Sequence, residues 1–125
     1  MIRKVLKDLD CSKTELSVLF TDDSHIMELN RQYLGRDRPT NVLAFPMSCD
    51  SISDVETGML GDVVISVDTA IRESAETGES LGETIDRLLI HGILHLLDYD
   101  HERSKEDEKD MRREEERLLL LIREE

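Results

Sequence analysis

Residues 59–66 read MLGDVVIS, and this β-branched, nearly continuous apolar run decides the fold. A strand that is apolar at successive positions, rather than at alternate ones, is typical of a sheet interior covered on both faces. Beyond residue 67 the apolar residues recur at helical spacing toward the C-terminus. Because strands come early in the chain and helices come late, the order of elements predicts an α+β domain.

Two helices and two strands are predicted before this run. Apolar spacing predicts a short helix over residues 2–9, a strand over residues 16–20, a helix with the stripe Ile26, Leu29, Tyr33 and Leu34, and a buried strand over residues 42–45. Gly35 is well placed to end the second helix in a left-handed conformation. Residues 36–40 read as a loop because Pro39 cannot extend a helix, and the polar residues 48–57 read as a solvated excursion.

Three helices are predicted after the run. The first covers residues 68–76 and ends near Gly78, and the second begins at a capping box made by Ser80 and Glu83. The second carries Leu81, Ile85, Leu88, Leu89 and Leu96 toward the core, and the last begins near Ser104 and carries Met111, Leu118, Leu119 and Ile122. No internal repeat or boundary is visible, so we expect one domain over residues 1–125.

The composition restricts the partners and the compartment. The 125 residues include 29 acidic and 16 basic residues, for a formal net charge of −13. This charge argues against a broad basic face that wraps nucleic acid, but it leaves room for a local groove that binds a few phosphates. No apolar run approaches the ~20 residues of a membrane helix, and no signal-peptide core is present at the start. Cys11 and Cys49 are too few for a disulfide framework, so we expect a cytoplasmic protein with reduced thiols and no membrane partner.

Three of the four histidines lie in one window, HGILHLLDYDH at residues 91–101. His91 and His95 are four residues apart, so on a helix their side chains share one face. His101 can join them if the helix ends and the chain turns back, and Asp98 lies where that turn would begin. Three imidazoles predict one metal ion per chain, with zinc favoured and copper, nickel and iron as further candidates.

The number of ligands indicates a catalytic metal rather than a structural one, because three protein ligands leave a fourth position for water. A zinc peptidase with this spacing would have the pattern H-E-x-x-H, whereas Gly92 stands where its glutamate would be. We expect Gly92 to leave room for a large substrate beside the metal. His25, isolated at the start of a predicted helix, is interpreted as an ordinary structural residue.

Three blocks of this sequence resemble one known family. The histidine window is similar to the signature H-G-x-L-H-L-x-G-Y-D-H of the YbeY family, the zinc-dependent bacterial endoribonucleases tied to rRNA maturation. Residues 30–46 are similar to its N-x-x-Y-R-x-x-D-x-P-T-(D/N)-V-L-S-F-P block, and residues 60–66 to its L-G-D-I-x-I-S strand. The resemblance runs from about residue 16 to about residue 121.

The resemblance implies an α+β fold in which helices flank a small mixed sheet, with the metal site on a helix and the turn after it. It implies that His91, His95 and His101 hold one zinc ion. It also implies cleavage of single-stranded RNA in the processing of small-subunit rRNA ends and in ribosome quality control. The expected partners are therefore single-stranded RNA, including rRNA, and the ribosome or its proteins, with no DNA.

The chain departs from the family pattern at three places. Leu34 stands where the family has arginine after the tyrosine, Asp98 replaces a glycine, and the family's first strand is absent or shortened. The family's arginine is expected to help bind or polarise the scissile phosphate, so no catalytic residue is assigned here. Arg36 and Arg38 are the predicted phosphate contacts instead, since guanidinium groups match phosphate geometry.

The chemistry predicted from the sequence leaves alternatives open. A metal-bound water or the 2′-OH of the RNA can be the attacking group, and the general base is unassigned between Asp62 and Asp100. We expect Asp62 to have a structural role at a strand-end turn and Asp100 to orient a histidine. The alternative functions are a non-enzymatic ribosome-associated module stabilised by zinc and, less favoured, a zinc peptidase.

Overall fold

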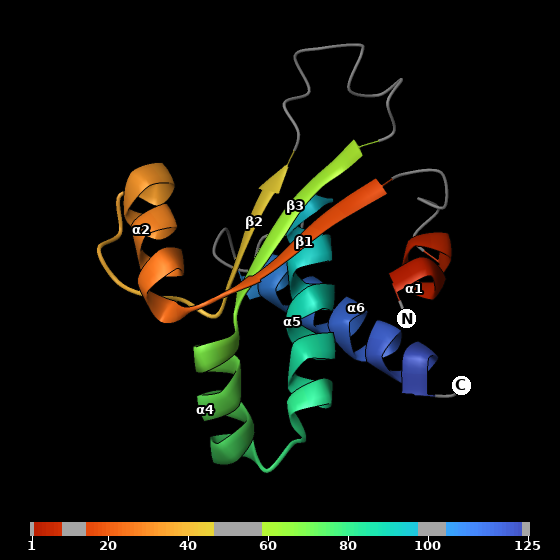
Figure 1. Cartoon of the computed structure of the whole chain (residues 1–125). Coiled ribbons are helices and arrows are strands. Elements are labelled where there is room, and N and C mark those ends of the chain that lie inside the picture. Colours follow the sequence, from red (N-terminus) through yellow and green to blue (C-terminus); the bar gives the residue numbers. More distant parts are fainter. Residues whose placement is uncertain (1, 9–14, 47–58, 98–104, 124–125) are drawn as a thin grey trace.

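A three-stranded sheet forms the centre of the fold, in the order β1-β3-β2 (Figure 1). The central strand β3 (Met59–Ser66) pairs in parallel with β1 (Glu15–Thr21) and antiparallel with β2 (Val42–Pro46). The structure is a computed structural model of the chain that describes residues 2–8, 15–46, 59–97 and 105–123. The expected α+β class with a small mixed sheet is therefore confirmed.

Helices cover both faces of the sheet, as the continuous apolar run of β3 predicts. Helix α2 (Asp23–Leu34) lies on one face, where Val64 packs with Ile26 and Leu43. Helix α5 (Leu81–Leu96) lies on the other face, where Val63 and Ile65 pack with leucines of α5. Because side chains alternate along a strand, residues 63 and 65 face α5 while residue 64 faces α2.

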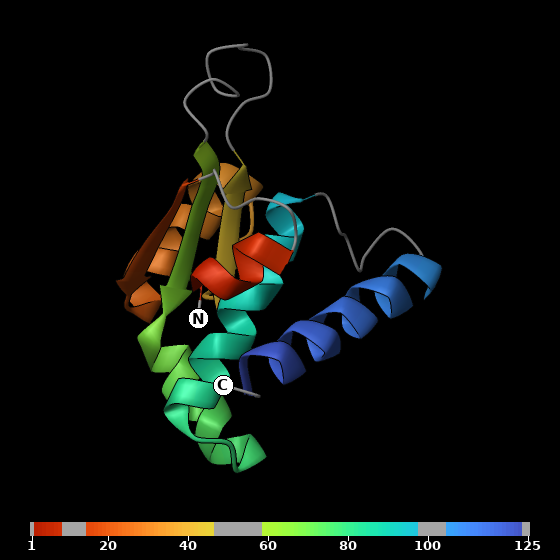
Figure 2. The same ribbon diagram turned by 90° about the vertical axis from the view of Figure 1, so that its right-hand side faces the viewer.

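The remaining helices build a second core beyond α5. Helix α6 (Lys105–Arg123) packs against α5 on the side away from the sheet (Figure 2). Helix α1 (Ile2–Asp8) adds Val5 and Leu6 to the same core, and α4 (Val67–Thr77) follows β3 directly and packs on α5. The buried side chains of this core are Val5, Leu6, Ile90, Ile93, Leu94, Met111, Leu118 and Ile122. None of the helices in the described ranges has an apolar stretch long enough to cross a bilayer.

The predicted helix ends are confirmed by their capping geometry. Gly35 and Gly78 end α2 and α4 with φ values of 69° and 79°, a left-handed conformation that glycine adopts without strain. At the start of α5 the Ser80 hydroxyl accepts from the Glu83 amide, and the Glu83 carboxylate accepts from the Ser80 amide. These ends are decided by local interactions, which is why the sequence predicts them well.

Some predicted core positions are more exposed than expected. Tyr33 and Leu34, at the end of α2, are 60% and 53% exposed, although the Tyr33 ring still packs on Phe45 of β2 with centroids 5.3 Å apart. Strand β2 was expected to be buried throughout, but Leu43 is its one buried side chain. The reason is that β2 lies at the edge of the sheet. Leu81 is 38% exposed at the first position of α5. The predicted excursion at residues 48–57 lies outside the described residues.

Asp23 joins the start of α2 to the start of α4. Its carboxylate accepts hydrogen bonds from the hydroxyls of Ser66 and Thr69 and pairs with Arg72 at 2.8 Å. These hydrogen bonds, with the smaller contribution of Arg72, lower the pKa of Asp23 to about 2. The junction therefore ties α2, the end of β3 and α4 together at neutral pH.

Candidate active site

Helix α5 brings His91 and His95 together on one face, as their spacing predicts. Their Nε2 atoms lie 3.1 Å apart, and the two rings meet edge to face with centroids 4.7 Å apart. Both side chains are partly buried, between the fully buried apolar face of α5 and solvent. The two Nε2 atoms are therefore within hydrogen-bond distance of each other and close enough to be bound by one ion.

This geometry fits a shared metal ion. Two ligands at ~2.0–2.1 Å from one tetrahedral ion lie about 3.3–3.4 Å from each other, close to the observed 3.1 Å. The predicted third ligand, His101, lies outside the described residues, as do the hinge Asp98 and the candidate carboxylate Asp100. Within the described ranges no group of three histidine, cysteine or acidic side chains comes close enough to hold an ion, so the pair is what the structure provides.

Glu115 of α6, which was not among the residues predicted from the sequence, contacts His91 on the side of the ring away from His95. Its Oε1 is hydrogen bonded to Nδ1 of His91, the ring nitrogen that faces away from His95. The sequence does contain a signal for it. Glu115 follows Met111 by four residues and precedes Leu118 by three, so it lies on the apolar stripe of the helix.

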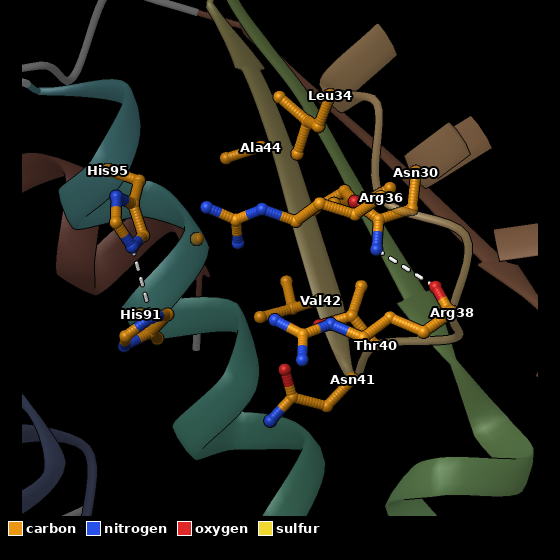
Figure 3. Close-up of a pocket in the computed structure, with 12 residues that line it drawn as sticks. Asn30, Leu34, Arg36, Arg38, Thr40, Asn41, Val42, Ala44, His91 and His95 are labelled. Carbon is orange, nitrogen blue, oxygen red and sulfur yellow. Dashed lines mark hydrogen bonds between the residues drawn. The ribbon is translucent and has the colours of Figure 1, made fainter. Parts of the chain in front are cut away.

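The loop after α2 forms the opposite wall of a pocket of about 600 Å³. Figure 3 shows the guanidinium groups of Arg36 and Arg38 reaching from this loop toward the histidines on α5. The structure thus brings both predicted phosphate contacts to the pocket that His91 and His95 line. The lining residues are Asn30, Leu34, Arg36, Arg38, Thr40, Asn41, Val42, Leu43, Ala44, His91, Gly92 and His95.

The charge of this pocket differs from that of the whole chain. Two arginines line it, and none of its described lining residues is acidic, although the chain carries a net charge of −13. A concave site of one sign concentrates the field at its centre. The charge of the pocket suits a local contact with an anion, which the net charge of the chain leaves possible.

Two asparagines hold the arginine loop in place. Asn30 is 2% exposed, and its Nδ2 donates to the carbonyl oxygen of Arg38 at 2.9 Å. Asn41 donates through Nδ2 to the Glu73 carboxylate of α4 at 2.9 Å, and its backbone carbonyl oxygen accepts from the backbone amide of Ser66 at 3.0 Å. The loop is thereby fastened to α2, β3 and α4, which limits the entropy lost when a ligand is bound.

Gly92 has a packing role in addition to the one expected. A Cβ at this position would lie 2.7 Å from Cγ1 of Val63 and 3.1 Å from Cγ2, which is too close for ordinary contact. The glycine lets α5 approach the sheet closely, and it also lines the pocket between the two histidines. Because α5 carries the histidines, this close approach also sets their distance from β2.

Asp62 lies in the middle of β3, opposite Ser17 and Phe45, and not at a strand-end turn as expected. Its position has the opposite parity to Val63, so its side chain projects toward the α2 face and is exposed. It is absent from the residues that line the pocket. Strand parity therefore removes Asp62 from the candidates for a general base.

Comparison with known proteins adds independent information. The family model described as Endoribonuclease YbeY matches residues 1–123. A protein of Syntrophus aciditrophicus named Endoribonuclease YbeY is 43% identical over 122 residues, which cover 97% of this chain and 76% of the relative. One of Aquifex aeolicus with the same name is 50% identical over 107 residues, 86% of this chain and 69% of the relative. The solution structure of TM1509 from Thermotoga maritima has a TM-score of 0.67 and 26% identity, over 97% of this chain and 75% of that one.

Proposed function

We propose, since the chain belongs to the YbeY family of endoribonucleases, that the pocket between α5 and the loop after α2 is where it cleaves RNA. The protein is an endoribonuclease, a hydrolase that acts on phosphodiester bonds of RNA. The observation that carries the assignment of the site is the arrangement of a convergent histidine pair and two arginines across one pocket. We further propose that the substrate is single-stranded and that the physiological target is the end of small-subunit rRNA.

The proposed metal is one zinc ion held by His91, His95 and His101. Three imidazole nitrogens are a ligand set typical of catalytic zinc, and the Nε2 separation of 3.1 Å supports the first two. When bound there, the ion would lower the pKa of a coordinated water and polarise a phosphoryl oxygen. The residues of the chain orient the ring nitrogens and hold the substrate on the opposite side.

Arg36 and Arg38 supply the proposed substrate contacts. A phosphodiester entering the pocket meets their guanidinium groups on one side and the histidine pair on the other. Charge-assisted hydrogen bonds to the nonbridging oxygens would hold the phosphate and stabilise the charge that develops as the bond breaks. Leu34, at the position where the family pattern has arginine, lines the same pocket and contributes no charge.

The sequence leaves two other functions open. A non-enzymatic, zinc-stabilised module is not favoured, because the relatives at 43–50% identity are named as endoribonucleases. A zinc peptidase would require a carboxylate where Gly92 stands, and Gly92 is packed against Val63 with no space for a side chain.

The proposed partner is the ribosome, in the cytoplasm. An acidic chain that holds RNA through this local cationic pocket gains little affinity from a long RNA, so a larger assembly would have to present the cleavage site. We expect the protein to sediment with small ribosomal subunits from a cell extract. Recovery in the ribosome-free fraction alone would refute this partner.

His95→Ala tests the proposed site, with His25→Ala as the matched control. His25 is exposed on α2 and hydrogen bonded to the Thr21 hydroxyl at 2.7 Å, away from the pocket. We expect His95→Ala to lose zinc and to cleave a single-stranded RNA at least 10²-fold more slowly, while His25→Ala cleaves normally. Equal cleavage by all three proteins, with zinc loss confirmed in His95→Ala, would show that the metal site is not catalytic.

A further inference from the structure

Helix α6 carries a carboxylate where the pattern of the helix calls for an apolar residue. Met111, Leu118 and Ile122 are 1%, 0% and 9% exposed and pack against α5, and Glu115 lies on the same stripe. The side chain of Glu115 is 20% exposed, so it has lost most of its hydration. A carboxylate in such a position is costly unless a donor satisfies it.

That donor is Nδ1 of His91. A carboxylate accepts hydrogen bonds and does not donate them, so the proton of this contact belongs to the imidazole. In the neutral ring the proton on Nδ1 leaves the lone pair on Nε2, the atom that faces His95 at 3.1 Å. Glu115 therefore selects the tautomer in which His91 can bind an ion on the pocket side.

We propose that Glu115 is a positioning residue for His91, which holds its ring orientation and its tautomer and so raises the affinity of the site for zinc. The inference rests on the proposed function, because it requires that His91 and His95 share an ion. A carboxylate behind a ligating histidine raises the basicity of the ligand and removes its freedom to rotate. Loss of such a partner is expected to weaken metal binding by about 10–100-fold.

The competing explanation is a simple tether between α5 and α6. A tether would stabilise the fold and leave the affinity for zinc unchanged, whereas a positioning residue acts on the metal. Glu115→Gln keeps the shape and one acceptor oxygen but removes the charge, and Glu115→Ala removes the acceptor. Glu116→Gln is the matched control, because Glu116 is the next residue of α6 and is exposed.

Zinc affinity is measured by competition with a chelator, and thermal stability is measured on the metal-free proteins. We expect the dissociation constant to rise from wild type to Glu115→Gln and further, by about 10–100-fold, in Glu115→Ala, with Glu116→Gln unchanged. Nitrogen NMR of the metal-free protein should find the proton of the neutral His91 ring on Nδ1 in the wild type. In Glu115→Ala it should be distributed over both nitrogens.

Three results would overturn the proposal. If Glu115→Ala loses stability but binds zinc within two-fold of wild type, the residue is a tether. If the neutral ring of His91 carries its proton on Nε2 in the wild type, the tautomer argument is wrong. His95→Ala is measured in parallel. Unchanged zinc binding by His95→Ala would refute the proposed metal site and this inference with it. If His95→Ala loses zinc while Glu115→Ala binds it normally, the inference alone is refuted.

Discussion

Replacing Gly92 by alanine tests how closely α5 must approach the sheet. The new Cβ would lie 2.7 Å and 3.1 Å from the two methyl carbons of Val63 and 3.4 Å from Cγ2 of Val42. Val63 is 0% exposed, and rotation about its χ1 exchanges one methyl group for the other. The helix must therefore move about 1 Å from β3 to reach an ordinary carbon–carbon distance of ~3.5–4.0 Å.

Two opposing effects decide the change in stability. Overpacking a well-packed core costs about 1–3 kcal/mol, whereas alanine is favoured over glycine inside a helix by about 1 kcal/mol. We expect the clash to dominate, because the atoms in contact are stiff and buried. The free energy of unfolding should fall by about 1 kcal/mol, which lowers the Tm of a chain of this length by about 3–5 °C.

The same displacement should affect activity more than stability. Gly92 lies between His91 and His95 along α5, so the helix carries both histidines away from the arginine loop. A misplacement of 1 Å at a reacting centre costs about 10²-fold in rate. RNA cleavage by Gly92→Ala, measured at saturating zinc, should therefore fall by about 10–100-fold.

The assay is a double-mutant cycle with Val63→Ala, in which the free energy of unfolding of each variant is measured by urea unfolding monitored by circular dichroism. When Val63 is shortened the clash disappears. The effect of Gly92→Ala on the free energy of unfolding should then change sign, so that the substitution stabilises the Val63→Ala protein by up to about 1 kcal/mol. The coupling energy between the two sites should be about 2 kcal/mol. Gly82→Ala in the same helix is the control, because the nearest atom to its Cβ is the Ser80 hydroxyl at 4.0 Å. Equal effects of Gly92→Ala in both backgrounds would refute the packing argument.

Three further predictions follow from the described contacts. Gly61→Ala should cost about 3 kcal/mol in urea unfolding, because φ is 147° and its Cβ would lie 2.5 Å from the Phe45 carbonyl oxygen; a loss below 1 kcal/mol would contradict this. Asp23→Asn should lower the free energy of unfolding by about 2 kcal/mol at pH 6. The pKa of Asp23 in the folded protein, about 2, is below that in the unfolded chain. The stability contributed by the ionised carboxylate is therefore complete above pH ~5 and is lost as the pH falls toward 2. The stability difference from wild type should therefore shrink in acid, and a constant difference would show that ionisation is not its source. Arg36→Ala and Arg38→Ala should weaken binding to single-stranded RNA and each reduce the salt slope by about 0.7, unlike Arg31→Ala outside the pocket; unchanged slopes would exclude the phosphate contacts.

Features that depend on residues close together in the sequence were predictable from it. The left-handed end at Gly35, the helix end near Gly78, the capping box at Ser80 and the strand at residues 59–66 all occur as predicted. The shared face of His91 and His95 follows from helical spacing alone. The histidine pair could thus be identified before the fold was known, whereas the metal itself stays a prediction.

Features that depend on which elements pack together were not predictable. Spacing along the chain cannot show that Glu115, 24 residues after His91, contacts its ring, or that Gly92 makes room for Val63. The sequence pattern also predicted Asp62 at a strand end, whereas β3 continues beyond it. The alternation of side chains along β3 turns the Asp62 carboxylate to the face of the sheet that α2 covers.

The sequence by itself determined the helices, the strand that is covered on both faces and the pair of histidines, because capping, β-propensity and helical periodicity act over a few residues. The tertiary structure decided what surrounds the pair. It brought Arg36 and Arg38 across the pocket from His91 and His95, and it set Glu115 behind His91. These arrangements depend on how α2, α5 and α6 pack around a three-stranded sheet, and packing joins residues whose separation in sequence carries no local signal.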